Sequence, residues 1–197
     1  MPTREQMEAI ARAYDEMPSG RTGDREAGWS YEAFRVELIA QRRIIPVTVE
    51  PWPHAGQPYA NSAEMFADVE RGRLSVYAGG DDHPFLTRDE NVMFRAVHDY
   101  FGHFVGRNSF GPLGEFRAWR AHCRMFSGGA IPALTAETLG QNCWVNYGPF
   151  SHLPPAERPF AEQKASLLPE ELWLPLLVDG GDVYVSRLGL PMRFPGC

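Results

Sequence analysis

The segment His98-Asp99-Tyr100-Phe101-Gly102-His103 constrains the fold more than any other stretch of the chain. Upstream, Thr87 and Glu90 form the pattern of a capping box, and apolar residues at helical spacing follow it, so we expect a helix leading into the first histidine. On a regular α-helix, residues five apart diverge by about 140° around the axis. The two histidines can share a face only if the helix ends or distorts between them, and Gly102, which lacks a Cβ, permits that distortion.

Two imidazoles that converge at a distorted helix end are suited to binding a metal ion. Glu137 adds to this pattern, because it stands in an otherwise apolar helical stretch, where a carboxylate is costly to bury unless it is paired or bound to a cation. We therefore predict a metal site formed by His98, His103 and Glu137. Two imidazoles and one carboxylate leave open positions, which suits non-haem iron(II), whereas a structural zinc site has four ligands, usually including cysteines.

Three further residues, Asp99, Glu115 and His122, are candidates for catalytic roles beside the metal. Glu115 and His122 lie two helical turns apart and so share one face of a predicted helix. Asp99, Glu115 and also Asn142 could orient the metal-bound imidazoles, while His122 could be a fourth ligand, a general acid or base, or a packed histidine. A solvated aspartate, a surface ion pair of Glu115 and a capping role for Asn142 stay open.

The histidine segment resembles the His-Glu-x-x-Gly-His motif of the pterin-dependent aromatic amino acid hydroxylases. Thr135-Ala136-Glu137-Thr138-Leu139-Gly140 is similar to that family's Thr-x-Glu-x-Gly context, with one extra residue, and His83-Pro84-Phe85-Leu86-Thr87 is similar to its lead-in to the metal helix. The resemblance covers roughly residues 60 to 145. Short, uncharacterised bacterial and phage proteins also look similar to this block.

The resemblance implies a hydroxylase-like catalytic core in which His98, His103 and Glu137 bind Fe²⁺ and a tetrahydropterin acts as co-reductant. Asp99 stands where that family has a glutamate beside the pterin. We predict a mononuclear non-haem iron(II) oxygenase that hydroxylates a small aromatic substrate with dioxygen. Three alternatives stay open: a two-metal helical oxidase, a zinc-dependent hydrolase with Glu115 or Asp99 as base, and a non-catalytic binding module with packed histidines.

The length of 197 residues predicts a single domain, 1–197, with a metal-binding core at about 60–150. The pattern of apolar residues predicts a mainly α fold with a small β-sheet (α+β). Ser30 is the expected cap of the second helix. We expect helices at about 4–17, 30–43, 62–71, 88–101, 113–126, 132–145 and 156–168, a further short segment at 170–178, and strands at 44–50, 74–78 and 182–187.

Charge and composition limit the partners. The net charge is −6, and the longest basic cluster, Gln41-Arg42-Arg43, is too short for a nucleic-acid surface, so we expect no tight nucleic-acid binding. The chain has no apolar run near the roughly 20 residues of a membrane span, and its N-terminus lacks a signal-peptide pattern. Its three cysteines form no Cys-x-x-Cys pair, which fits a reducing compartment. We therefore expect a cytoplasmic protein acting on a small molecule.

Overall fold

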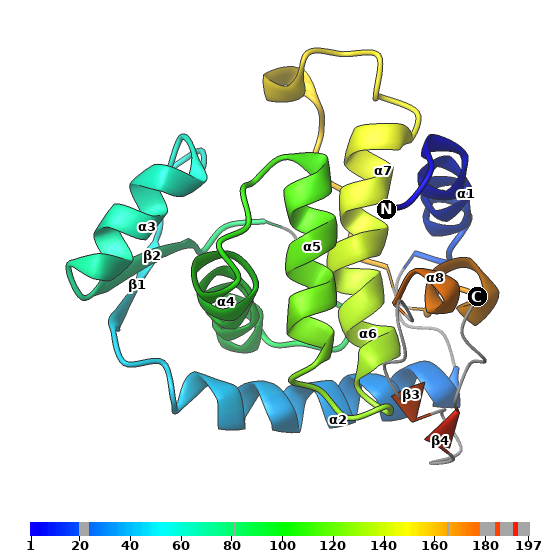
Figure 1. The fold of residues 1–197 in the computed structure, drawn as a ribbon, viewed down its shortest axis with the longest axis horizontal. Coiled ribbons are helices and arrows are strands. Elements are labelled where there is room, and N and C mark those ends of the chain that lie inside the picture. Colours follow the sequence, from blue (N-terminus) through cyan, green and yellow to red (C-terminus); the bar gives the residue numbers. More distant parts are fainter. Residues whose placement is uncertain (20–23, 81, 165, 178–183, 186–190, 193–197) are drawn as a thin grey trace.

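The computed structural model describes residues 1–19, 24–80, 82–164, 166–177, 184–185 and 191–192. It is mainly helical with a small β-sheet, as the sequence predicted, and the pairing of β1 with β2 in this sheet is parallel (Figure 1). The α-helices are α1 (Arg4–Asp15), α2 (Arg25–Arg42), α3 (Ser62–Glu70), α4 (Arg88–Val97), α5 (Pro112–Cys123), α6 (Ile131–Thr135), α7 (Gln141–Tyr147) and α8 (Glu170–Leu177). Two π-helical segments, η1 (His98–Val105) and η2 (Ala136–Gly140), continue α4 and α6, and η3 (Pro155–Glu157) is a 3₁₀ turn.

Capping side chains set where the helices begin. Capping boxes form at α1 and α4, with Thr3 and Thr87 as the N-caps, and the second of them is the one predicted above. The predicted cap and start of α2 were wrong: Asp24 caps this helix by accepting hydrogen bonds from two backbone N–H groups, and the helix starts earlier than expected. Ser30 lies inside the helix and is buried, and its hydroxyl donates to the Gly129 carbonyl at 2.7 Å. Its role is to join α2 to the segment that opens α6.

The parallel sheet lies at one end of the molecule, beside α3 and α4 (Figure 1). Strand β1 (Thr48–Trp52) pairs with β2 (Arg73–Tyr77), with Val49 opposite Leu74, and α3 is the connection that parallel pairing requires. Leu74 and Val76 are buried against Met65 of α3 and Ala96 of α4. The observed β1 starts later than expected, and Pro46 lies before it, outside the paired residues.

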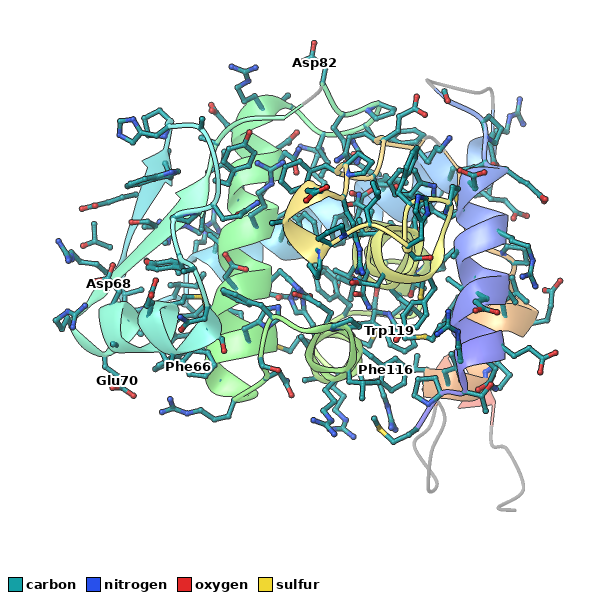
Figure 2. The ribbon with its side chains drawn as sticks, turned by 90° about the horizontal axis from the view of Figure 1, so that it is seen from above. Phe66, Asp68, Glu70, Asp82, Phe116 and Trp119 are labelled. Atoms are coloured by element: carbon teal, nitrogen blue, oxygen red, sulfur yellow. The ribbon has the colours of Figure 1, made fainter. Side chains whose placement is uncertain are left out.

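Helix α5 passes through the centre of the fold, between α4 with η1 on one side and α7 on the other (Figure 1). Its Phe116 and Trp119 are buried, and the Trp119 indole N–H donates to the Thr135 hydroxyl at 3.0 Å (Figure 2). Helix α1 covers the outer side of α7, where a Cβ on Gly140 would lie 2.6 Å from the ring of Tyr14. The central helix therefore fixes the position of the segment that carries the paired histidines.

The helix predicted at 156–168 is not formed in the described residues of that range. Among them only the end of η3 is helical, and Lys164 makes an isolated antiparallel bridge with Ser19. Pro159 explains the difference, because it removes a helical donor and disfavours helical backbone at Arg158. The strand predicted at 182–187 contains β3 (Tyr184–Val185), which pairs with β4 (Pro191–Met192), and its other residues lie outside the described ones.

In the described part of the chain, no helix combines the length and the apolar character needed to cross a membrane.

Candidate metal centre

The π-helix η1 brings His98 and His103 together. Because a π-helix has i→i+5 hydrogen bonds, residues five apart lie one above the other along its axis. The two imidazole rings are perpendicular, with their centroids 4.9 Å apart. The distortion expected between the histidines is thus a π-helical stretch.

Glu115 of α5 lies opposite the two histidines and completes the cluster. Its Oε2 atom is 3.4 Å from Nε2 of His98 and 3.1 Å from Nε2 of His103. One ligand atom from each of the three residues lies within 4.8 Å of the others. The His103 side chain is buried, while those of His98 and Glu115 are partly exposed. These three residues form a group that could hold a metal ion.

The spacing and protonation of the ligands fit a metal ion. Bonds of about 2.0–2.2 Å to one ion place neighbouring ligand atoms about 3.0–3.4 Å apart, which matches the separations of Glu115 from both imidazoles. Nδ1 of His103 donates its hydrogen to the Asn108 carbonyl at 3.0 Å, so in the neutral ring Nε2 presents its lone pair toward Glu115. The Asn108 amide is itself fixed, because it donates to the Gly102 carbonyl at 2.8 Å.

The charges of the cluster are coupled. Burial opposes ionisation of Glu115, but hydrogen bonds from His103 and His98 outweigh it and lower the pKa of Glu115 to about 2. Burial likewise opposes a charge on His103, yet its hydrogen bond with Glu115 and the charges of Glu115 and Asp99 raise the pKa of His103 to about 8. Without a metal, a proton on His103 balances Glu115 at neutral pH. A cation would take the place of that proton.

The predicted catalytic residues lie in or beside this cluster. Glu115 belongs to it, and Asp99 follows His98 in η1, where burial raises its carboxyl pKa despite the opposing charges of the two histidines. His122 is fully buried beside His98, and the centroids of the two imidazole rings are 5.7 Å apart. The Asn142 amide nitrogen donates to the Pro112 carbonyl at 3.2 Å, and its oxygen accepts from the Asn146 amide at 2.9 Å.

The structure places Glu137 in a different set of contacts from those of His98 and His103. It lies in the second π-helix, η2, and its carboxylate accepts hydrogen bonds from Tyr31 at 2.5 Å, from His83 at 2.9 Å and from Gln141 at 2.9 Å. The group of possible metal ligands in the described residues contains Glu115 with His98 and His103, and Glu137 is not one of its members. The expectation that a buried Glu137 must be paired is met by these three donors.

The hydrogen-bond partners of His83 define its tautomer. Its Nδ1 accepts from the backbone N–H groups of Phe85 and Leu86 at 3.0 and 2.9 Å, so Nε2 carries the hydrogen and donates to Glu137. The side chains of His83 and Glu137 are almost completely buried. Sequence reasoning missed Tyr31, His83 and Gln141, and the only indication of them was that a buried carboxylate needs partners.

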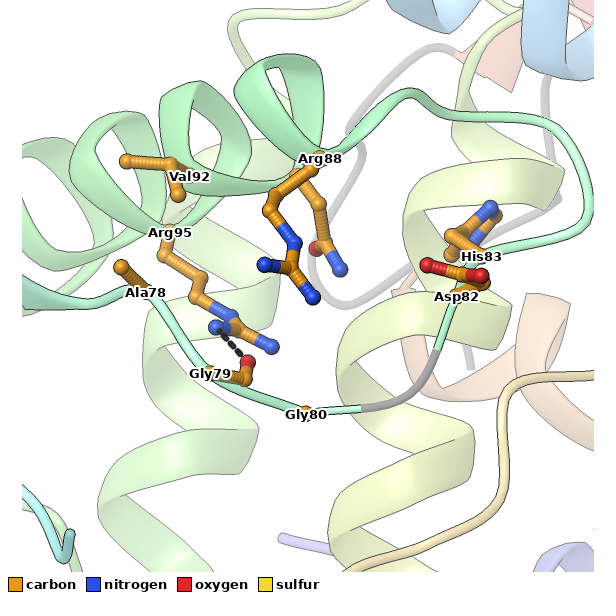
Figure 3. A pocket seen from close by; sticks show the side chains of 9 residues that line it. Ala78, Gly79, Gly80, Asp82, His83, Arg88, Val92 and Arg95 are labelled. Atoms are coloured by element: carbon orange, nitrogen blue, oxygen red, sulfur yellow. Dashed lines mark hydrogen bonds between the residues drawn. The ribbon is translucent and has the colours of Figure 1, made fainter. Parts of the chain in front are cut away.

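A pocket lies between α4 and the Gly79–Gly80 turn, beside this second cluster (Figure 3). His83 lines it together with Arg88 and Arg95. Arg95 donates through one nitrogen to the carbonyls of Tyr77 and Gly79, at 2.5 and 2.8 Å, which joins α4 to the end of β2. Its guanidinium also lies over the Tyr77 ring, 5.2 Å from the centroid.

Comparisons of this chain with protein-family models, with curated proteins and with solved structures found no match. The feature of this protein that indicates a chemical function is the His98–His103–Glu115 cluster, which could hold a metal ion.

Proposed function

We propose that this protein is a mononuclear non-haem iron(II) oxygenase whose metal is bound by His98, His103 and Glu115. The supporting observation is that one carboxylate oxygen of Glu115 lies 3.4 and 3.1 Å from the Nε2 atoms of His98 and His103, and that the ligand atoms of the three residues lie within 4.8 Å of one another. Two histidines and one carboxylate, with positions left open, are the ligand set preferred by iron(II) oxygenases. The substrate class, a small aromatic molecule, and the tetrahydropterin co-reductant come from the sequence resemblance alone.

Ferrous iron bound at this cluster would supply the redox chemistry of oxygen activation. The chain's own residues hold and balance it. Asn108 fixes the ring of His103, Glu115 supplies one negative charge, and Asp99 is a carboxyl group beside the ligands that could take up or release a proton.

Two buried ring nitrogens without hydrogen-bond partners disfavour the alternative in which the histidines are only packed in the core. Among the described residues, Nδ1 of His98 and Nδ1 of His122 are buried without a hydrogen-bond partner, and an inert core histidine would satisfy both nitrogens. The two-metal alternative has little support, since His122 pairs with the Gln41 amide and the described residues contain one group of three or more metal-ligand side chains.

Metal content tests the site. Protein loaded anaerobically with Fe²⁺ is expected to retain one equivalent of iron after desalting, and elemental analysis should show its loss in His98→Ala and Glu115→Gln. His152→Ala is the matched control, because His152 is an exposed histidine far along the chain from the cluster. Unchanged iron in both site variants would overturn the proposal.

Metal identity and oxygen uptake test the chemistry. The iron-loaded protein should consume dioxygen when given an aromatic amino acid and a tetrahydropterin, with a hydroxylated product detected by mass spectrometry. Selective retention of zinc without oxygen uptake would instead support the hydrolase alternative, in which Asp99 is the remaining candidate base.

Glu137→Gln belongs in the same set of variants. If Glu137 is a metal ligand, as the sequence predicted, Glu137→Gln should release iron. The hydrogen bonds of Glu137 with Tyr31, His83 and Gln141 favour the opposite result, in which this variant retains its iron.

A further inference from the structure

The two histidines of the cluster differ in what their second ring nitrogen contacts. A metal-bound imidazole usually donates its other N–H to an acceptor, which fixes the ring and raises its basicity as a ligand. His103 meets this requirement through the Asn108 carbonyl at 3.0 Å. Nδ1 of His98 is buried and has no partner among the described residues. Binding of a metal through Nε2 of His98 therefore leaves an N–H that needs an acceptor.

His122 offers an unpaired acceptor on the neighbouring helix. Its side chain is fully buried, and its Nδ1 has no partner in the described part of the chain. Gln41 fixes the tautomer: its amide nitrogen donates to the Met125 carbonyl at 3.1 Å, so its oxygen faces His122 and accepts the Nε2–H at 2.9 Å. A neutral imidazole whose Nε2 carries the hydrogen has its lone pair on Nδ1.

The packing of α5 against η1 places His122 beside His98. Glu115, Ala118 and His122 occupy positions i, i+3 and i+7 of α5 and so share one face. Ala118 approaches η1 at Gly102, where an added Cβ would lie 3.3 Å from the Ala118 Cβ and 3.2 Å from Nδ1 of His98. The rings of His98 and His122 are 5.7 Å apart between centroids. The same helix face thus carries a metal-binding carboxylate and, beyond it, the unpaired imidazole.

The geometry points to His122 as a positioning residue: its Nδ1 accepts the Nδ1–H of metal-bound His98, directly or through one buried water, and Gln41 holds it in the accepting tautomer. This inference rests on the proposed metal centre. Loss of such a hydrogen bond typically weakens metal binding by 10–100-fold.

Cobalt(II) binding to the full chain tests the contribution to affinity. His122→Phe keeps an aromatic ring but removes both nitrogens, and we expect its Kd for Co²⁺ to rise about 10–100-fold. His122→Asn, which restores an acceptor oxygen, should recover part of that loss. Cys123→Ala is the matched control, since Cys123 is the next buried residue of α5 and lies outside the cluster. It should bind Co²⁺ like the natural chain.

Proton NMR of the Co²⁺-loaded protein provides a readout that packing alone would not change. Two paramagnetically shifted, solvent-exchangeable N–H signals are expected, from His98 and His103. In His122→Phe and in Gln41→Met the His98 signal should move or exchange rapidly, while the His103 signal stays. Gln41→Met keeps the His122 ring in place, so it answers the question if His122→Phe fails to fold.

The outcomes separate this inference from the proposed metal centre. One outcome overturns the role of His122 alone. In it, His98→Ala abolishes Co²⁺ binding, whereas His122→Phe or Gln41→Met leaves both the Kd for Co²⁺ and the two N–H signals unchanged. A natural chain that binds no Co²⁺ overturns the metal centre and this inference together.

Discussion

The backbone of Gly102 passes directly against the imidazole of His98, so that a Cβ at this position would lie 3.2 Å from Nδ1 and 3.3 Å from Cε1 of the ring. Such a contact is too close for an alanine unless the ring or α5 shifts. The absence of a side chain at this position is therefore what allows the π-helix and α5 to enclose the histidine.

Gly102→Ala should weaken metal binding and destabilise the protein by about 1–3 kcal/mol, because the added methyl group overpacks the contact between His98 and Ala118. Urea denaturation and Co²⁺ titration would measure the two effects. Gly28→Ala is the control: Gly28 lies inside α2 with no atom within 4 Å of the added Cβ. This change should stabilise the fold by up to about 1 kcal/mol, and an equal response of both variants would contradict the packing argument.

Metal affinity should depend on pH through His103. Its pKa of about 8 in the metal-free protein means that this imidazole is mostly protonated at pH 7, and it must lose the proton to bind a metal. Affinity should therefore rise about tenfold per pH unit up to about 8 and then level off. Calorimetry in buffers of different ionisation enthalpy should detect release of about one proton at pH 7. Binding that is independent of pH between 6 and 8 would be inconsistent with this coupling.

Tyr31→Phe should destabilise the protein without releasing the metal. It removes the hydroxyl that donates to Glu137 at 2.5 Å, and a buried hydrogen bond to a charged group is worth about 1.5–3 kcal/mol. Denaturation midpoints would show the loss, and elemental analysis should show unchanged iron. Iron loss comparable with that of Glu115→Gln would mean that the Glu137 cluster also supports the metal site.

Arg95→Met should lower stability by about 1.5–3 kcal/mol, since its guanidinium donates to the carbonyls of Tyr77 and Gly79 at the end of β2. The second of these hydrogen bonds is drawn in Figure 3. Thermal unfolding would measure the effect. Arg107→Met serves as the comparison, because the ion pair of Arg107 with Glu70 is exposed and should contribute about 0–1 kcal/mol. A smaller loss of stability in Arg95→Met than in Arg107→Met would contradict the proposal that Arg95 stabilises the fold by joining α4 to the end of β2.

Local patterns predicted the parts of the fold that depend on neighbouring residues. The capping box at α4, two short strands and the helix that carries the histidines follow from side chains within a few positions of each other. The apolar pattern at 156–168 is typical of a helix, but Pro159 lacks the N–H that a helix interior requires, and the described residues there form only the end of η3.

The ligand set could be predicted only in part. The pair His98 and His103 is local in sequence, and its odd spacing already required a distorted helix. The carboxylate was assigned to Glu137 because an acid in an apolar stretch indicates burial, yet burial does not specify a partner. Tyr31 and His83, far away in the sequence, pair with Glu137, whereas Glu115 reaches the histidines through the packing of α5 against η1.

The π-helical form of η1 also bears on how such a site could arise. A π-helical turn corresponds to an α-helical turn with one inserted residue, and functional sites are frequent at these insertions. Removing one codon between the two histidines would leave them four positions apart, still on one side of an ordinary α-helix. A shortened chain of this kind could keep both nitrogens in reach of a metal while losing the bend that positions them against Glu115. Comparing it with the natural chain would separate the contribution of ligand identity from that of backbone shape.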